Sequence, residues 1–275
     1  MRKLFALFIL LLWGTVASAQ VDMVRLTRFE GQPIRGISVS SAFDVELIRS
    51  DRTYAVVEIN AALEDLLRFE MDGQGVVTLG LHGSRGLAEK KVLRARVYLS
   101  ELAFLQASGA SDVRCSGSFE SNSAQIDLSG ASEVKGLFLT SVGDVRLKCG
   151  GASDLTGAVI RCRSLNGTFS GASDARIDDF GGNLTCDLSG SSDLRISGEA
   201  GIVFVKATGA SSFLGASLGA RDVNVQASSA SQVDVGHVEG EFAANGSSAS
   251  SITYRGTPTI RSITSSSASS VKRIL

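Results

Sequence analysis

A motif of four small residues recurs nine times in this chain, at intervals close to twenty residues. The first copy is SGAS at 108–111, and every copy ends in a serine. These serines are Ser111, Ser132, Ser153, Ser173, Ser192, Ser211, Ser231, Ser250 and Ser269. Their successive spacings are 21, 21, 20, 19, 19, 20, 19 and 19 residues. A period of this length, sustained over so many copies, is typical of a solenoid.

The residues around each serine alternate between apolar and polar side chains. In the third copy, Val145, Leu147 and Cys149 precede the serine at even offsets. Leu155 follows it at an even offset. A period of two marks a β-strand, and no copy carries the apolar stripe of a helix. The sequence therefore predicts an all-β, single-stranded β-helix, a β-solenoid of about 20 residues per rung, for which we take the right-handed form.

The repeated motif is predicted to be a structural corner. Small residues suit a place where a rung bends sharply and the interior is narrow. Counting through SGAS places the glycine and the serine in the inward row and the alanine outside. We expect the serine hydroxyls to satisfy peptide groups at this corner. Ser229, Ser248 and Ser267 replace the glycine in the last three copies, so we attribute the glycine to its small volume and not to a left-handed backbone.

The first nineteen residues have the features of a signal peptide. Arg2 and Lys3 precede an apolar run at 4–13, and the small residues at 17–19 fit a cleavage site. We therefore expect export to the periplasm, the outer-membrane surface or the extracellular space. No later segment is apolar enough to span a membrane.

The rest of the chain is predicted to be one continuous stack. Residues 103–275 hold the nine repeats. Residues 20–102 have longer strands and one possible helical turn at 61–69, and they lack the SGAS corner. Because the open end of a solenoid exposes unpaired strands that need covering, we interpret 20–102 as N-terminal rungs and a cap.

Charge argues against a nucleic-acid partner. Without Arg2 and Lys3, the 27 basic residues become 25, against 28 acidic ones, which leaves a net charge of −3. A nucleic-acid-binding surface would need a clear excess of basic residues.

An acidic residue follows the serine in each of the first five repeats. The five residues are Asp112, Glu133, Asp154, Asp174 and Asp193. Stacked rungs would align them in a column, and such a column is the one candidate for a Ca²⁺ site. Arg114, Lys135, Arg176 and Arg195 lie two residues after four of these acids. We therefore predict a solvated face of weak ion pairs, with no bound metal and no cofactor.

Neither the cysteines nor the histidines form a recognisable site. Cys115, Cys149, Cys162 and Cys186 occupy different phases of the repeat, so no pair is indicated. His82 and His237 have no motif around them. We predict no catalytic residue.

The repeat pattern, (S/G)-(G/S)-A-S-(D/E/S)-apolar, resembles the bacterial DUF2807 family, the putative autotransporter adhesin, head GIN domain. Upstream, SSAFDVELI (40–48) looks like the opening strand of that family, and the segments at 54–60, 76–81 and 93–99 look like the strands that follow. The resemblance covers roughly residues 30–275. It implies an all-β, β-helix-like envelope protein of Bacteroidetes-type bacteria, from a family without an assigned activity.

Three functions compete for such a solenoid. The first is a cell-envelope adhesin or scaffold without catalytic activity, which binds an unknown cell-surface or extracellular ligand, a glycan or a protein. The second is a polysaccharide-binding or polysaccharide-processing β-helix. The third is an ice-binding or mineral-binding face. Processing enzymes need a cleft and aromatic platforms, whereas the repeat spacing is nearly constant and the lone Trp13 lies in the signal peptide. A regular Thr-x-Thr pattern is missing, so we favour the first function.

Overall fold

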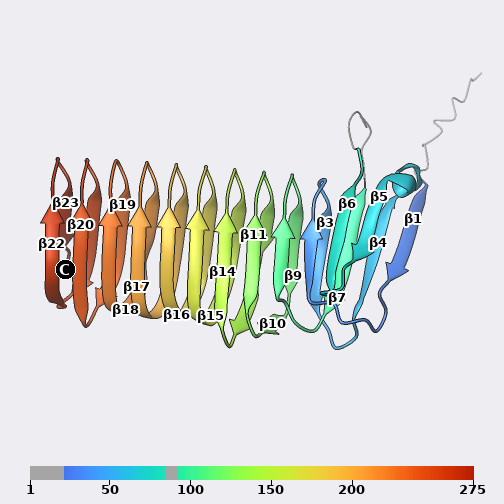
Figure 1. Cartoon of the computed structure of the whole chain (residues 1–275), viewed down its shortest axis with the longest axis horizontal. Helices are drawn as coiled ribbons and strands as arrows, with labels where there is room; N and C mark the ends of the chain where they lie inside the picture. The colour runs from blue at the N-terminus through green and yellow to red at the C-terminus, as the bar shows by residue number, and fades with distance from the viewer. Residues whose placement is uncertain (1–21, 84–91) are drawn as a thin grey trace, which may run out of the picture.

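The computed structural model describes residues 22–83 and 92–275, and the predicted signal peptide at 1–19 lies outside them. The chain forms flat rungs stacked along one long axis (Figure 1). Each rung has two walls, which meet at a pointed turn along one edge of the stack and at a wider bend along the other. The predicted β-solenoid, with rungs about 20 residues apart, is confirmed.

The repeats supply strands β8 to β23. Their bounds are β8 Phe104–Ala107, β9 Asp112–Ser116, β10 Ser118–Ser121, β11 Ala124–Leu128, β12 Glu133–Lys135, β13 Phe138–Ser141, β14 Asp144–Cys149, β15 Asp154–Phe169, β16 Asp174–Leu188, β17 Asp193–Ala207, β18 Ser212–Ala227, β19 Gln232–Val238, β20 Glu241–Gly246, β21 Ser251–Gly256, β22 Thr259–Ser265 and β23 Ser270–Arg273. Each strand pairs in parallel with the equivalent strand of the next rung.

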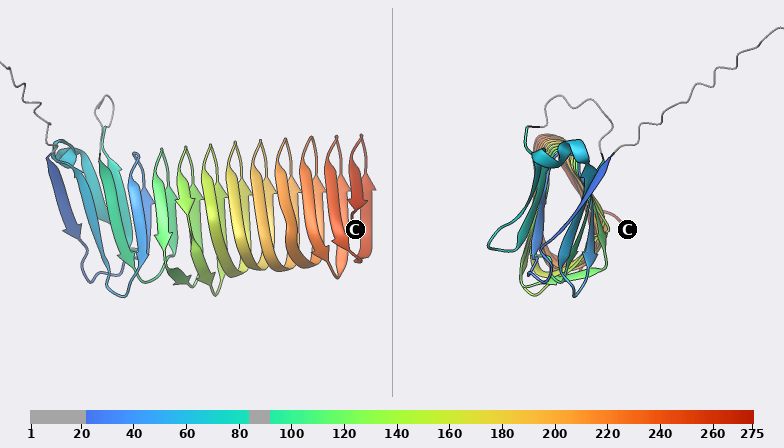
Figure 2. Two further views of the ribbon diagram at one scale, coloured as in Figure 1. Left: turned by 180° about the vertical axis from the view of Figure 1, so that it is seen from behind. Right: turned by 90° about the vertical axis from the view of Figure 1, so that its right-hand side faces the viewer.

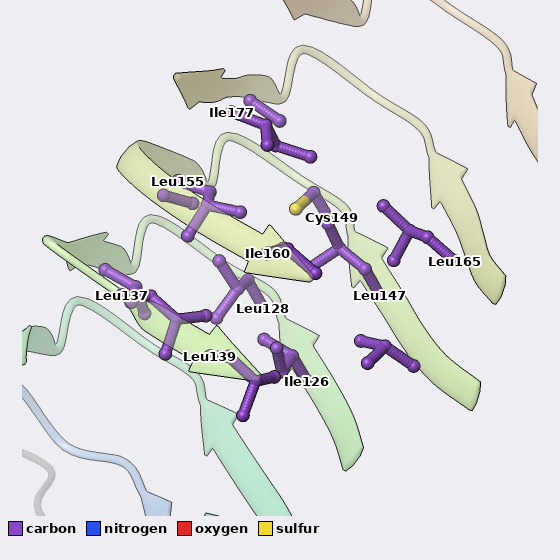
Figure 3. Close-up of a cluster of buried hydrophobic side chains, with 14 of the residues drawn as sticks. Ile126, Leu128, Leu137, Leu139, Leu147, Cys149, Leu155, Ile160, Leu165 and Ile177 are labelled. Carbon is purple, nitrogen blue, oxygen red and sulfur yellow. The ribbon is translucent and has the colours of Figure 1, made fainter. Parts of the chain in front are cut away.

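The core is a set of apolar columns between the two walls. Ile126 lies opposite Leu105 in one neighbouring rung and opposite Leu147 in the other, and all three side chains are fully buried. Figure 3 shows how the inward side chains of successive rungs stack, with Cys149 as one of them. Full burial of an aliphatic side chain stabilises a fold by about 1.5–3 kcal/mol, so the alternation found in the sequence is the main source of cohesion.

The pointed turn is formed by the repeated motif, and our assignment of its glycine was wrong. Ser111 is fully buried, but Gly109 and Ala110 are both exposed. The six corner glycines have φ between 73° and 78°, in the left-handed region. The parity count fails because the chain reverses direction within these residues, so strand alternation does not continue through them.

The corner glycines are also in close contact with one another. The amide of the residue after each of the later five glycines donates to the carbonyl of the preceding corner glycine, at 2.6–2.8 Å. A Cβ atom added to Gly171 would lie 2.5 Å from the carbonyl oxygen of Gly151. The glycine is therefore needed both for its left-handed backbone and for its lack of a side chain.

Two of the three serine-containing corners, at 247–250 and 266–269, use a different turn, whereas in the corner at 228–231 only Ser229 is left-handed, with φ of 64°. In the corner at 247–250, Ser248 and Ala249 are both left-handed, with φ of 52° and 65°. The amide of Ser250 donates to the carbonyl of Ser247 at 3.3 Å, within the same turn. Two left-handed central residues closed by such a bond are the pattern of a type I′ turn. This turn places a side chain at both left-handed positions.

The N-terminal strands stack out of chain order. Their bounds are β1 Met23–Arg28, β2 Gly36–Val39, β3 Asp44–Arg49, β4 Tyr54–Asn60, β5 Leu67–Met71, β6 Val76–Leu81 and β7 Leu93–Leu99. The rung of β2 and β3 pairs in parallel with β8 and β9 on one side. On its other side it pairs in parallel with β6 and β7, which come later in the chain. This region lacks the SGAS sequence, but Ser40–Phe43 forms an equivalent corner. Ser41 and Ala42 are left-handed, and Phe43 is buried in the place of the serine.

The outermost N-terminal layer is antiparallel. Strand β4 pairs with β7, β5 pairs with β6, and β1 pairs with β4. The possible helical turn at 61–69 is a 3₁₀ turn, η1 (Ala61–Leu66), followed by β5. We propose that this layer caps the stack, because it covers the open edge of β6 and β7. At the other end, β22 and β23 form the last rung, at the red end of the stack (Figure 2). Ile260 and Ile263 in this rung are 45% and 44% exposed.

The corner geometry predicts a large difference between two glycine substitutions. Gly171→Ala should lower the free energy of unfolding by at least about 1–3 kcal/mol, because alanine must adopt a left-handed backbone and its Cβ would contact Gly151. Gly73→Ala, where an added Cβ meets no atom within 4 Å, should change it by less than about 0.5 kcal/mol. Urea unfolding followed by circular dichroism measures both, and equal losses would contradict this account of the corner.

Candidate functional site

The corner serines use their hydroxyl groups within the fold. Eight of the nine donate to main-chain carbonyls, either three residues earlier or in the preceding rung. Ser132, for example, bonds to the carbonyls of Ser129 at 2.9 Å and Ala107 at 3.1 Å. Ser153 is the exception, since its buried hydroxyl has no partner among the described residues. Because these hydroxyls point inward, the serine column is not presented to a ligand.

The acidic residues form a column on the wall that follows the corner. Glu133 lies opposite Asp112 and Asp154, Asp154 lies opposite Asp174, and Asp174 lies opposite Asp193. Asp44 extends the column at its N-terminal end, opposite Asp112. We missed Asp44 in the sequence because its corner reads SSAF. The available signal was a run of small residues, Ser40–Ala42, followed by an aspartate between two apolar residues.

At Asp154, burial and the neighbouring acids outweigh the neutralisation by Lys135. Burial, and then the charges of Asp174 and Glu133, raise the pKa of the Asp154 carboxyl. Lys135 pairs with Glu133 at 2.7 Å, but Arg176 pairs with Asp178 at 2.6 Å instead of with Asp174. In residues 22–83 and 92–275, no group of three or more His, Cys, Asp and Glu side chains is arranged to hold a metal ion.

The four cysteines are free thiols. Cys149 and Cys186 point into the core, and Cys115 and Cys162 are partly buried. Burial raises the pKa of Cys115 and of Cys149 to about 12. These thiols are therefore protonated at neutral pH, and a protonated thiol is a poor nucleophile.

The opposite wall, which precedes the corner, carries an open groove of about 710 Å³. It crosses six successive rungs, from the turn before β6, beside β2, over β8, β11 and β14 to β15. Its polar lining consists of Arg35, Gln74, Ser123, Gln125, Asp144, Arg146 and Asn166. Its apolar lining consists of Val76, Ala103, Phe104, Ala124 and Val145. We call this feature the wall groove.

One column of outward residues runs along the wall groove. Phe104, Gln125, Arg146 and Asn166 are opposite one another in successive rungs, so they repeat at about 4.8 Å. Phe104 is half-buried and lies opposite Gly36. A Cβ atom on Gly36 would overlap the carbonyl oxygen of Phe104 and lie 2.7 Å from its Cβ, so the close approach of the two strands requires the glycine.

The polar groups of the wall groove are held in defined orientations. The side-chain amide of Gln125 donates to Asp127 at 2.6 Å, which leaves its carbonyl oxygen free to accept a bond from a ligand. Asp144 accepts from Arg163 at 2.9 Å, and this contact lowers the pKa of the Asp144 carboxyl. Arg35 pairs with Glu101 at 2.8 Å.

The sequence pattern did not reveal the wall groove. Its residues are ordinary outward positions of the repeat, and one end of it is the turn at 72–75. The carbonyl of Gly75 in this turn accepts a hydrogen bond from the amide of Arg35 at 2.8 Å, across about forty residues of sequence. Only the out-of-order stacking of β2 and β6 brings that turn beside the repeats.

Comparisons with known proteins agree with this architecture. The family model described as "Putative auto-transporter adhesin, head GIN domain" matches residues 34–180 and again 145–258. The chain belongs to this family. No curated protein gives a significant match.

Several solved structures share the fold. A putative adhesin from Parabacteroides distasonis is 15% identical, with a TM-score of 0.66 over 92% of this chain and 97% of its own. A putative lipid binding protein from the same organism is 18% identical, with a TM-score of 0.58 and the same coverage. A putative adhesin from Parabacteroides merdae is 13% identical, with a TM-score of 0.59, again over 92% and 97%. Within the described part of this chain, no helix is long and apolar enough to cross a membrane.

The corner serines predict a matched pair of stability effects. Ser173→Ala removes a buried hydrogen bond to the Cys149 carbonyl and should cost about 1 kcal/mol. Ser153→Ala removes a buried hydroxyl that has no partner among the described residues and should be neutral or stabilising. Thermal melts of the two variants test this, and a larger loss for Ser153→Ala would contradict it.

Asp154 in the acidic column and Asp144 in the wall groove should affect the pH dependence of stability with opposite sign. The raised pKa of Asp154 means that its ionised form destabilises the fold, a penalty present at neutral pH and lost as the pH falls through the raised folded pKa to the unfolded value of about 3.9. Asp154→Asn should therefore raise the melting temperature at pH 7, with a smaller effect in acid. Asp144 has a lowered pKa and stabilises the fold above that same unfolded value, so Asp144→Asn should lower the melting temperature at pH 7. Shifts of the same sign at pH 7 would refute this reading.

Proposed function

We propose that this protein is an exported, non-catalytic binding module of the bacterial cell envelope, an adhesin or scaffold that holds an extracellular ligand on one wall of its solenoid. The wall groove is the observation that carries the proposal. Over six rungs it presents side-chain amides, a hydroxyl, guanidinium groups and an aromatic ring. Four of these side chains repeat at the strand spacing, namely Phe104, Gln125, Arg146 and Asn166. Ligand sites combine apolar surface with a few convergent polar groups in this way.

The sequence and the family support the remaining parts of the proposal. The signal-peptide features of residues 1–19 favour export to the periplasm, the outer-membrane surface or the extracellular space. Membership in a family described as adhesins favours a binding role. The ligand is a glycan or a protein, and the balanced charge of the mature chain argues against nucleic acid.

The chemistry of the wall groove favours binding over polysaccharide processing. Glycoside hydrolysis uses a pair of carboxyl groups, one of which has a raised pKa so that it can act as an acid. The described lining contains a single carboxyl group, Asp144, and Arg163 lowers its pKa. This carboxylate is suited to an ion pair and not to proton donation.

Two tryptophan substitutions test the proposal. Asn166 lies in the wall groove, and Asn224 occupies the same outward column further along the stack, outside the groove. Asn166→Trp should block the wall groove and reduce binding of the mature chain, residues 20–275, to a glycan array and to whole bacterial cells by at least about tenfold, or about 1.4 kcal/mol. Asn224→Trp should bind as the wild type does.

The same three proteins also test the alternative function, polysaccharide processing. Incubation with neutral and acidic polysaccharides should release no shorter products. Release of products would show an enzyme. Equal binding by wild type and both variants would place the contact outside the wall groove, and an absence of any binding would remove the adhesin proposal.

A further inference from the structure

We propose that the wall groove recognises an acidic saccharide, a uronate-type glycan whose carboxylate is bound by Arg146. This inference rests on the proposed binding function and names the ligand class of the same site. The wall groove, the pattern of ion pairs around it and the order of side chains along it carry the argument.

Arg146 is the one uncompensated charge among the described residues that line the wall groove. The groove lining has two other charged residues, and both are paired. Arg35 is paired with Glu101 at 2.8 Å, and Asp144 is paired with Arg163 at 2.9 Å. Arg146 is exposed, and in residues 22–83 and 92–275 no carboxylate lies within 4.0 Å of its guanidinium. A ligand in this groove therefore meets a single net positive charge, which favours an anion.

The surroundings of Arg146 suit a carboxylate that is carried on a polar ring. A guanidinium presents a planar fork of donors that matches a carboxylate in two parallel hydrogen bonds. Gln125 lies one rung before Arg146, and Asn166 lies one rung after it. Amide side chains both donate and accept hydrogen bonds, so they can bind the hydroxyl groups on either side of the carboxylate.

Phe104 supplies the apolar part of the site. Its ring is half-buried and lies one rung before Gln125, two rungs from Arg146, or about 10 Å along the stack. An aromatic face packs well against the C–H face of a sugar ring, and its burial adds contact area with little loss of side-chain freedom. The order of Phe104, Gln125, Arg146 and Asn166 therefore predicts a chain that runs along the solenoid axis.

The backbone of this wall argues for a saccharide over an acidic peptide. Extended peptides commonly bind by adding a strand to an exposed sheet edge. The strands under the wall groove are paired on both sides, as β11 is by β8 and β14. Recognition here depends on side chains alone, and neutral amides beside one cation fit hydroxyl groups beside one carboxylate.

Isothermal titration of the mature chain tests the proposal with matched ligands and matched variants. The probes are oligomers of galacturonate, glucuronate and mannuronate, each beside its methyl ester of the same length, which has the same hydroxyl groups but no charge. The variants are Arg146→Gln, Arg146→Lys and, as a control on the opposite wall, Arg195→Gln, whose arginine is equally exposed. Circular dichroism verifies that each variant is folded.

At least one free acid should bind the wild type more tightly than its ester does. Arg146→Gln should weaken that binding by about ten- to a hundredfold and leave the weak binding of the ester unchanged. Arg146→Lys should retain part of the affinity, because lysine keeps the charge but loses the fork. Arg195→Gln should have no effect.

The outcomes separate this inference from the proposed function. Esters that bind as tightly as the free acids, or free acids that bind Arg146→Gln as they bind the wild type, would overturn the acidic-saccharide site and leave a glycan-binding module. Equal competition by polyglutamate would overturn selectivity for a saccharide. If no probe binds while whole cells are still bound, the ligand class is wrong and the adhesin function stands. If neither the probes nor whole cells are bound, both the acidic-saccharide site and the adhesin function are wrong.

Discussion

The contact between successive corner turns is the constraint on which the rest of the solenoid depends. At the glycine corners, a main-chain hydrogen bond of 2.6–2.8 Å joins each turn to the one before it, and an added Cβ would overlap the neighbouring carbonyl. The rungs can stack at strand spacing along both walls only if this narrow edge closes to the same spacing. The repeat of small residues therefore reflects a backbone requirement, and the buried serines complete it by donating to nearby carbonyls.

Much of this structure follows from the alternation in the sequence, and the rest depends on long-range pairing. Val145, Leu147 and Cys149 were placed in the core by parity, and they are buried. Gly109 was wrongly assigned to the inward row. The alternation of inward and outward side chains holds only within a strand, and the chain reverses direction at the corner. The wall groove could not be predicted, because it requires the rung of β2 and β3 to lie between β6/β7 and β8/β9. Asp44 had a local signal in the small residues before it, but its place in the acidic column depends on the same pairing. Strand pairing across forty or more residues leaves no local pattern.

The two walls of the solenoid differ in how their charges are balanced. On one wall, acids stack on acids, and mutual repulsion together with burial raises the pKa of Asp154. On the other wall, the charges at the wall groove are paired, apart from Arg146 among the described lining residues. For the anionic ligand that we propose, this charge pattern favours contact at the groove over contact at the acidic column.

A stacked solenoid also separates the requirements of folding from those of recognition. Inward residues of a rung contact the core, while outward residues such as Gln125 and Arg146 contact only their column neighbours and the solvent. Because the main-chain ladder fixes the spacing of these side chains before a ligand arrives, binding orders few additional groups, which favours affinity. In later rungs the same column holds Phe204, Asn224 and Ala243, while the strands of this wall keep their parallel pairing. Outward substitutions can therefore alter what the wall binds at little cost to stability, provided that the corner and the inward rows are kept.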